Sequence, residues 1–167
     1  MERWRRIDSA PEQEARDLLW TCCGSSRWVE RMLARRPFGS RETALDVARE
    51  EWFALTRAEW IQAFSHHPRI GDRDALRRKF AATGALSERE QAGVSGASDE
   101  TLAALLDGNR EYETRFGYIF IVCATGKSAD EMLALLRARL KNDPETEIGI
   151  AAEEHARICE LRLLQET

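Results

Sequence analysis

The pattern that most constrains the fold is a helix-start signal that recurs along the whole chain. In this signal a short polar residue precedes a glutamate by three positions, so that each side chain can bond the backbone N–H of the other. The starts are Ser9 with Glu12, Thr56 with Glu59, Ser87 with Glu90, Ser128 with Glu131, and the pair Asp143–Pro144. Glycines and prolines between them are expected helix stops: Gly24, Pro37, Pro68, Gly84, Gly96 and Gly126.

Apolar residues between these signals recur at intervals of three and four, which is the spacing of one helix face. The stripes are Trp28, Met32 and Leu33; Leu45, Ala48, Trp52 and Leu55; Leu102, Leu105, Leu106 and Tyr112; and Met132, Leu135, Leu136 and Leu140. The one strand-like run, residues 118–124, has no evident partner strand, so we expect a buried extended segment or a buried helix start. We predict an all-α fold: a single compact domain of about eight helices over residues 1–167.

Charge and apolar content argue against two classes of partner. The net charge of −4 is unlike that of a general nucleic-acid binder, which normally shows a basic stripe. No apolar run approaches the roughly 20 residues of a membrane helix, and the N-terminal MERWRRIDSAPEQE lacks the apolar stretch of a signal peptide. We therefore expect a cytoplasmic protein without nucleic-acid or membrane partners.

Cysteines and common motifs indicate neither a metal site nor a bound cofactor. The four cysteines show no CxxC spacing and are expected to be reduced, packed thiols: Cys22, Cys23, Cys123 and Cys159. Two adjacent histidines and a distant His155 lack the spacing of a zinc site. The sequence also has no GxGxxG after a strand, no phosphate-binding loop and no GxSxG.

Two adjacent histidines precede a proline in SHHPRIGD, residues 65–72. Helical spacing places His67 on the inward face of the preceding helix, in line with Trp60 and Phe64, and turns His66 about 100° away. Pro68 is expected to end the helix there. His67 is thus either an acid–base candidate at a chain corner or a core histidine bonded to a carbonyl, and His66 is expected to be a surface residue.

Two further segments carry candidate binding groups. Ser87, Glu90 and Gln91 in SEREQ cluster a hydroxyl, a carboxylate and an amide at a helix N-terminus, although Glu90 has an alternative role in capping. Arg162 lies on or beside the apolar stripe of the last helix. It is either a buried cation that requires an anion or an arginine with its head in water, and Arg139 is a weaker rival. These groups fit cofactor-free proton transfer on a small anionic substrate.

A series of motifs, spread over residues 27–163, resembles one known family. The motifs, in this order, are RWVERMLARRPF at residues 27–38, HPRIGD, SxxEQ, NxxYxxxFGYIFIVCATGK, LRARLKNDPETE and IxxLRL. Together they resemble the 2-oxo-4-hydroxy-4-carboxy-5-ureidoimidazoline (OHCU) decarboxylases, which form (S)-allantoin in the last step of urate degradation. The resemblance implies an all-helical, homodimeric lyase that needs neither metal nor organic cofactor.

The same resemblance implies roles for individual residues. His67 and Glu90 match the family's catalytic histidine and carboxylate. The positions that match substrate-binding residues are Pro68, Ser87, Gln91, Phe116, Phe120, Ile121, Val122 and Arg162. Two other readings of the residues stay open. One is an inactive helical ligand-binding module, and the other is a metal-dependent phosphohydrolase suggested by the paired histidines and Asp72.

Overall fold

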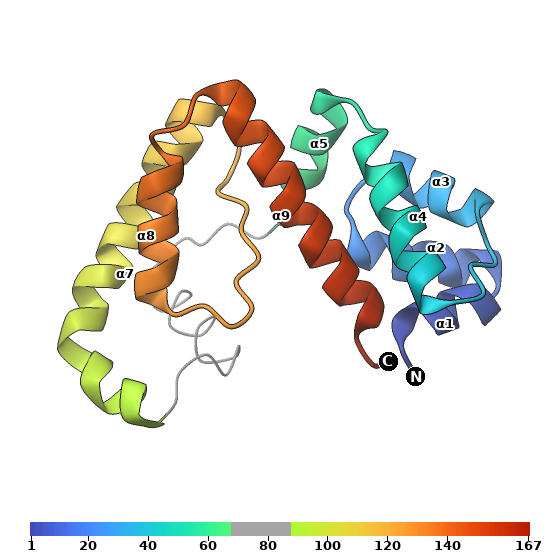
Figure 1. Cartoon of the computed structure of the whole chain (residues 1–167), viewed down its shortest axis with the longest axis horizontal. Helices are drawn as coiled ribbons and strands as arrows, with labels where there is room; N and C mark the ends of the chain where they lie inside the picture. The colour runs from blue at the N-terminus through green and yellow to red at the C-terminus, as the bar shows by residue number, and fades with distance from the viewer. Residues whose placement is uncertain (68–87) are drawn as a thin grey trace. The chain divides into compact units, whose positions relative to one another are not determined.

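The computed structural model describes residues 1–67 and 88–167, with the backbone alone for residues 88–98. Within these ranges the chain forms helices and no strand, apart from a single bridge between Glu2 and Glu166 (Figure 1). The described helices are α1 (Arg3–Ser9), α2 (Glu12–Cys22), α3 (Ser26–Ala34), α4 (Arg41–Phe53), α5 (Arg57–Phe64), α7 (Glu88–Phe116), α8 (Ala129–Arg139) and α9 (Pro144–Leu164). The predicted all-α class is confirmed.

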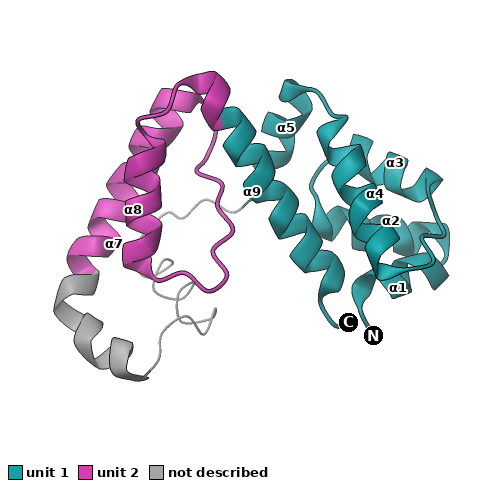
Figure 2. Ribbon diagram, in the orientation of Figure 1, with its two compact units in different colours: residues 1–67, 148–167 teal, residues 68–147 magenta. Residues whose placement is uncertain are grey.

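The chain divides into two compact units (Figure 2). Unit 1 consists of Met1–His67 and Ile148–Thr167, and unit 2 consists of Pro68–Glu147. The first turn of α9 therefore belongs to unit 2 and the rest of that helix to unit 1. The expected single domain over residues 1–167 stays a prediction.

Tryptophan side chains connect the helices of unit 1. Trp28 on α3 and Trp52 on α4 are buried, and their ring N–H groups donate to the carbonyls of Ala48 on α4 and Ala152 on α9, each at 2.9 Å. Trp60 on α5 donates to the carbonyl of Trp52, also at 2.9 Å. A buried indole needs a partner for its N–H group. The rings of Trp28 and Trp52 therefore fill core volume, and all three rings fix a hydrogen bond between two helices.

Helices α7 and α8 lie side by side in unit 2 (Figure 1). A Cβ atom at Gly108 would stand 2.6 Å from Cδ2 of Leu136, so glycine permits the close approach of the two helices. The predicted stop at Gly96 is wrong, because α7 continues through it from Glu88 to Phe116. A glycine inside a helix costs about 1 kcal/mol relative to alanine, and tertiary packing of the helix can offset that amount.

Most of the predicted helix starts that can be checked are confirmed. Thr56 and Glu59 form a complete capping box, Ser128 caps α8, and the carboxylate of Asp143 accepts from the first amides of α9. The start at Ser9 is wrong. Ser9 is the last residue of α1, and its hydroxyl donates back to carbonyls in its own helix, as serines in a final turn often do. Ser87 lies outside the described residues.

The strand-like run after α7 is an extended segment without a strand partner among the described residues, as one of the two alternatives predicted. Gly117 and Gly126 flank it with φ angles of 83° and 76°, which other residues rarely adopt. Tyr118, Ile121, Val122 and Cys123 within it are buried. The segment is therefore a core element of unit 2.

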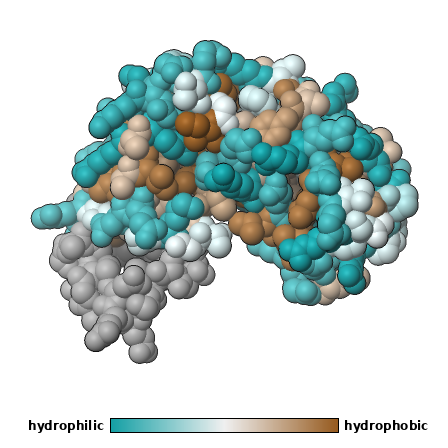
Figure 3. All heavy atoms as spheres, viewed as in Figure 1, coloured by the Kyte–Doolittle hydropathy of each residue, from teal (hydrophilic) through white to brown (hydrophobic). Residues whose placement is uncertain are grey.

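Apolar side chains are mostly packed inside the described part of the chain. The large apolar side chains that are exposed there are Met1, Trp20, Phe53 and Leu161. On the face drawn in Figure 3, hydrophobic residues are interspersed with hydrophilic ones. None of the described helices has the length and apolar character needed to span a membrane.

Candidate active site

His67 follows the last turn of α5 and faces a buried histidine. Its backbone N–H group donates to the carbonyl of Phe64 at 3.1 Å. Its half-buried ring meets the ring of His155 edge-on, with centroids 5.0 Å apart. His66 is exposed and instead meets Trp20 on α2 edge-on at 5.0 Å. The two adjacent histidines therefore contact different helices, as helical spacing predicts. This separation speaks against a shared metal site on the pair.

His155 is a fully buried imidazole on α9. Its ring stacks on Trp52 with centroids 4.2 Å apart, and its Nδ1 lies 3.4 Å from Sγ of Cys159. Burial lowers the pKa of His155 well below its ordinary value, and the nearby His67 and Arg162 lower it further. His67 consequently packs against a ring that is neutral at neutral pH.

Arg162 binds the end of α2. Its Nη1 donates to the carbonyls of Cys22 at 3.1 Å and Thr21 at 3.3 Å. A cation at the C-terminal carbonyls of a helix is favourable because the helix dipole is negative there. Among the described residues the other guanidinium nitrogens of Arg162 have no hydrogen-bond partner shown, so they remain suited to a carboxylate or carbonyl ligand.

The buried arginine that pairs with an anion is Arg139, which sequence analysis ranked below Arg162. Its Nη2 lies 2.6 Å from Oε1 of Glu147, and both side chains are buried. Tyr112 donates its hydroxyl to the same carboxylate oxygen, and Asn142 donates to the other oxygen at 2.9 Å. Burial and the bond to Glu147 raise the pKa of Tyr112, which keeps its hydroxyl protonated as a donor.

The same arginine anchors the extended segment. Arg139 Nη1 donates to the carbonyl of Ile121 at 2.6 Å, and its guanidinium carbon lies 4.5 Å from the ring centre of Phe120. The rings of Phe116 and Phe120 pack against Tyr112, with centroids at 4.7 Å and 5.1 Å. Unit 2 thus gathers the predicted positions Phe116 and Phe120–Val122 around one buried network.

The helical spacing of Arg139 was the signal that could have identified this network. Arg139 follows Leu136 by three positions and Met132 by seven, which places it on the apolar stripe of α8. Its partner Glu147 was not predictable in the same way, because the pairing depends on the turn between α8 and α9. Both residues lie in the motif LRARLKNDPETE, which does not by itself indicate that they pair.

The remaining predicted positions cannot be placed at atomic detail. Pro68 and Ser87 lie outside the described residues, and Glu90 and Gln91 lie where only the backbone of α7 is described. His67 and Arg162 belong to unit 1, whereas Phe116 and Phe120–Val122 belong to unit 2. The assignment of these residues to one ligand site stays a prediction.

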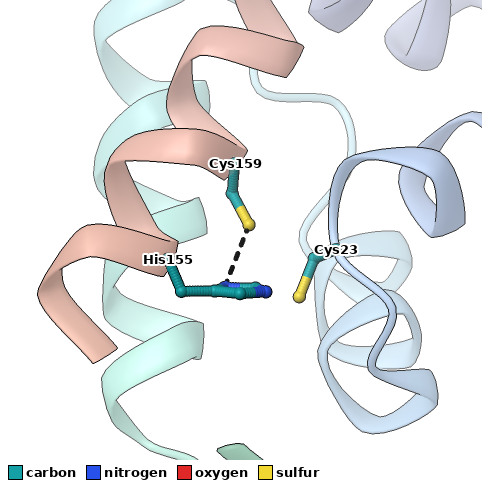
Figure 4. Close-up of side chains that lie close together, drawn as sticks. All are labelled: Cys23, His155 and Cys159. Carbon is teal, nitrogen blue, oxygen red and sulfur yellow. Dashed lines mark hydrogen bonds between the residues drawn. The ribbon is translucent and has the colours of Figure 1, made fainter. Parts of the chain in front are cut away.

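All four cysteines are buried and none forms a disulfide, as predicted. Burial disfavours ionisation of two of them: it raises the pKa of Cys22 to about 11 and that of Cys159 well above its ordinary value. Cys23, His155 and Cys159 nevertheless bring three potential ligand atoms together (Figure 4). Sequence spacing did not reveal this cluster, because Cys23 meets α9 only in the folded chain.

Comparisons with known proteins agree on one family. A model of the OHCU decarboxylase family matches residues 8–164. The uric acid degradation bifunctional protein TTL of Arabidopsis thaliana is 39% identical over 145 residues, which cover 85% of this chain and 44% of that protein. The 2-oxo-4-hydroxy-4-carboxy-5-ureidoimidazoline decarboxylase of Amia calva is 36% identical over 97 residues, which cover 58% of this chain and 55% of that protein. The chain thus spans about half the length of these relatives.

Solved structures extend the similarity to three dimensions. A crystal structure of OHCU decarboxylase in the presence of (S)-allantoin has a TM-score of 0.71 and 32% identity, and the match covers 92% of this chain and 96% of that chain. A structure of (S)-allantoin synthase has a TM-score of 0.68 at 18% identity, which shows likeness of fold alone.

Proposed function

This chain belongs to the OHCU decarboxylase family, and on that premise we propose that it converts 2-oxo-4-hydroxy-4-carboxy-5-ureidoimidazoline to (S)-allantoin and CO2. The reaction is the last step of urate degradation and places the chain among the carboxy-lyases of purine catabolism. The observation that carries the proposal is the family match over residues 8–164. The 32% identical structure with (S)-allantoin gives further support.

The chemistry of this substrate requires positioning and proton control. Loss of CO2 leaves an electron pair that the neighbouring ring C=N bond can accept, so the reaction needs no metal or organic electron sink. The carbon that becomes the stereocentre must then receive a proton from one side only. A pocket that excludes water would suppress the spontaneous, racemic reaction.

His67 and Glu90 are assigned the proton transfers, with one acting on the substrate hydroxyl and the other on the new stereocentre. The contact of His67 with the ring of His155 supports this assignment, because that ring is neutral and places no positive charge beside His67. Arg162 is assigned an anionic or carbonyl end of the substrate. It should not grip the departing carboxylate, since tight ground-state binding of that charge opposes its loss.

The recognition groups complete the proposed site. Ser87 and Gln91 would bond the ureido and ring amides, and Pro68 and Phe116 would line the pocket. Backbone groups of Phe120–Val122 would contact the ligand. The anchoring of Ile121 by Arg139 supports this last role, because it holds the backbone of the segment in one position.

The deciding experiment supplies freshly made substrate from urate oxidation and upstream hydrolysis and follows optical activity. The chain should accelerate formation of one-handed allantoin. His67→Ala should lower turnover about 10²–10⁴-fold, the usual value of general acid–base help, while His66→Ala serves as the matched control and keeps activity. Equal losses in the two variants would remove His67 from the mechanism, and racemic product at the spontaneous rate would remove the function.

Glu90→Gln separates chemistry from helix capping. Glutamine can replace glutamate in a capping box, so far-UV circular dichroism and Tm should remain unchanged while turnover falls. Normal turnover with a lowered Tm would instead assign Glu90 to capping.

We further propose that the chain works as a homodimer in the cytoplasm. The family resemblance supports the first point, and the composition supports the second. Light scattering on the purified full chain tests the dimer, and a monomeric mass at working concentration would contradict it. Fractionation of the native host tests the location.

A further inference from the structure

A cluster of three metal-ligand side chains lies inside unit 1 (Figure 4). Cys23 caps the C-terminus of α2, whereas His155 and Cys159 stand four residues apart on one face of α9. Cys23 and His155 are 0% exposed and Cys159 is 4% exposed. One ligand atom from each residue lies within 4.8 Å of the other two.

The spacing of these atoms is close to what a tetrahedral ion requires. Bonds of about 2.3 Å to sulfur and about 2.0–2.1 Å to nitrogen place neighbouring ligand atoms roughly 3.5–3.8 Å apart. The ion would bind Nε2 of His155, the ring nitrogen without a partner among the described residues, while Nδ1 keeps its contact with Sγ of Cys159 at 3.4 Å. Even the upper limit of 4.8 Å leaves only about 1 Å to close, which small rotations of the cysteine side chains can provide.

An incomplete hydrogen-bond arrangement at the same place is an independent sign of a missing partner. Nε2 of His155 is buried and has no partner among the described residues. Figure 4 shows this end of the ring directed toward Cys23. Buried polar atoms are nearly always satisfied by protein, water or an ion, so an orphaned ring nitrogen directed toward a thiol requires an explanation.

We propose that Cys23, His155 and Cys159 form a binding site for a soft divalent cation of the zinc class. Two thiols lose their protons to solvent as the ion binds, so that two thiolates, one neutral imidazole and the ion have no net charge. Neutrality matters because a buried net charge is costly. Thiolate and imidazole ligands select zinc-like ions over magnesium or calcium, and a water molecule can complete the tetrahedron.

The site is separate from the proposed decarboxylation, which needs no metal. It adjoins that chemistry through His155, whose ring contacts His67. A bound ion would also connect the end of α2 to α9, because its ligands come from both. Metal binding and decarboxylation are therefore tested separately, and failure of either leaves the other standing.

Titration of the reduced, metal-free full chain with Cd²⁺ tests the site. We expect one ion per chain, thiolate-to-metal charge-transfer absorption, release of two protons per ion and a raised Tm. Cys23→Ser and His155→Gln should each weaken binding at least tenfold. Cys123→Ser replaces a buried cysteine in unit 2 and should leave binding unchanged. Absence of the charge-transfer band, or equal weakening by Cys123→Ser, would overturn the proposal.

A measurement on the unmodified chain avoids dependence on folding of the variants. Zinc-edge X-ray absorption of the zinc-loaded protein should show two sulfur ligands at about 2.3 Å and nitrogen or oxygen ligands at about 2.0–2.1 Å. A shell of oxygen and nitrogen alone would mean that the ion binds elsewhere and would overturn the site.

Discussion

At the scale of single residues, burial determines which groups Arg139 and Arg162 bind. Arg139 is 6% exposed and pairs with the fully buried Glu147, whereas the half-buried Arg162 bonds two helix-end carbonyls. A buried guanidinium needs an anion nearby because water cannot solvate it. Arg162 has partial access to solvent, so neutral acceptors suffice and its charge stays available for a ligand.

Removal of Arg139 should be among the most damaging single substitutions in unit 2. Arg139→Met leaves Glu147 buried without its cation, and breaking such a pair costs about 3–5 kcal/mol of the free energy of unfolding. Urea denaturation measures the loss. The double variant Arg139→Met/Glu147→Leu removes both charges and should recover part of it. A double variant less stable than the single one would show that the pair is not the reason.

Residue types were easier to anticipate than their partners. Helical spacing placed His67 inward and His66 outward because both directly follow the last turn of α5, where local geometry still determines the direction of a side chain. The partners of Arg139 and of Cys23 come from other elements. Their contacts depend on how the chain turns between helices, which spacing within one helix does not encode.

At the scale of elements, the extended segment owes its position to side chains outside it. The carbonyl of Ile121 accepts from Arg139 on α8, and Phe120 packs under the same guanidinium. An extended segment without strand partners has no ladder of backbone hydrogen bonds to fix it. Arg139 therefore acts on the segment as a positioning residue.

Arg139→Lys should separate that positioning from stability. Lysine keeps the positive charge beside Glu147, but its single ammonium lacks the fork that reaches both Glu147 and Ile121. Under the proposed activity, KM should rise roughly tenfold, the equivalent of one lost charged hydrogen bond, with a smaller change in kcat. Arg110→Lys, at an exposed pair with Asp107, is the matched control. An unchanged KM would dissociate the segment from binding.

The start of α9 should depend on pH through Asp143. Bonds from the side chain and backbone of Thr146 lower the pKa of this carboxyl in the folded chain. The unfolded chain thus binds the proton more readily, so the stabilisation is present above the ordinary pKa of about 3.9 and is lost as pH falls through the folded value. Asp143→Ala should lower Tm by roughly 2–5 °C at neutral pH and by less in acid. Equal decreases at both pH values would contradict charge-dependent capping.

Element boundaries were predictable where the signal is local. Thr56 and Asp143 cap their helices with bonds inside a single turn, and their own sequence neighbours determine those bonds. Ser9 carries a local start signal, yet it is the last residue of α1. Gly96 carries a local stop signal, yet α7 continues through it. Contacts with other parts of the folded chain determine where these two helices end, and a short window of sequence does not contain those contacts.

At the scale of the whole molecule, unit 1 is assembled from the two ends of the chain. The backbone N–H group of Arg3 donates to the carbonyl of Gln165 at 2.9 Å, and the backbone N–H group of Thr167 donates to the carbonyl of Met1 at 3.1 Å. Residues 68–147 are inserted between its two parts. The core of unit 1 therefore requires contacts between residues far apart in sequence, such as Trp52 with Ala152.

A circular permutant should make unit 1 continuous and speed its folding. Joining Thr167 to Met1 through a short glycine–serine linker, and opening the chain between Thr125 and Gly126 in an exposed turn, places Ile148–Thr167 directly before Met1–His67. The long insertion then no longer has to be closed before the core forms, which lowers the entropic cost of folding.

Tryptophan fluorescence can follow unit 1 alone, because all five tryptophans lie within residues 1–67. Stopped-flow refolding should be faster in the permutant than in the parent chain, with Tm changed by only a few degrees. The matched control is the parent chain with the same glycine–serine residues inserted between Thr125 and Gly126 and its ends left unjoined, since it carries a changed turn but not the new connection. Slower refolding of the permutant would show that the core of unit 1 forms without first bringing the two ends of the chain together.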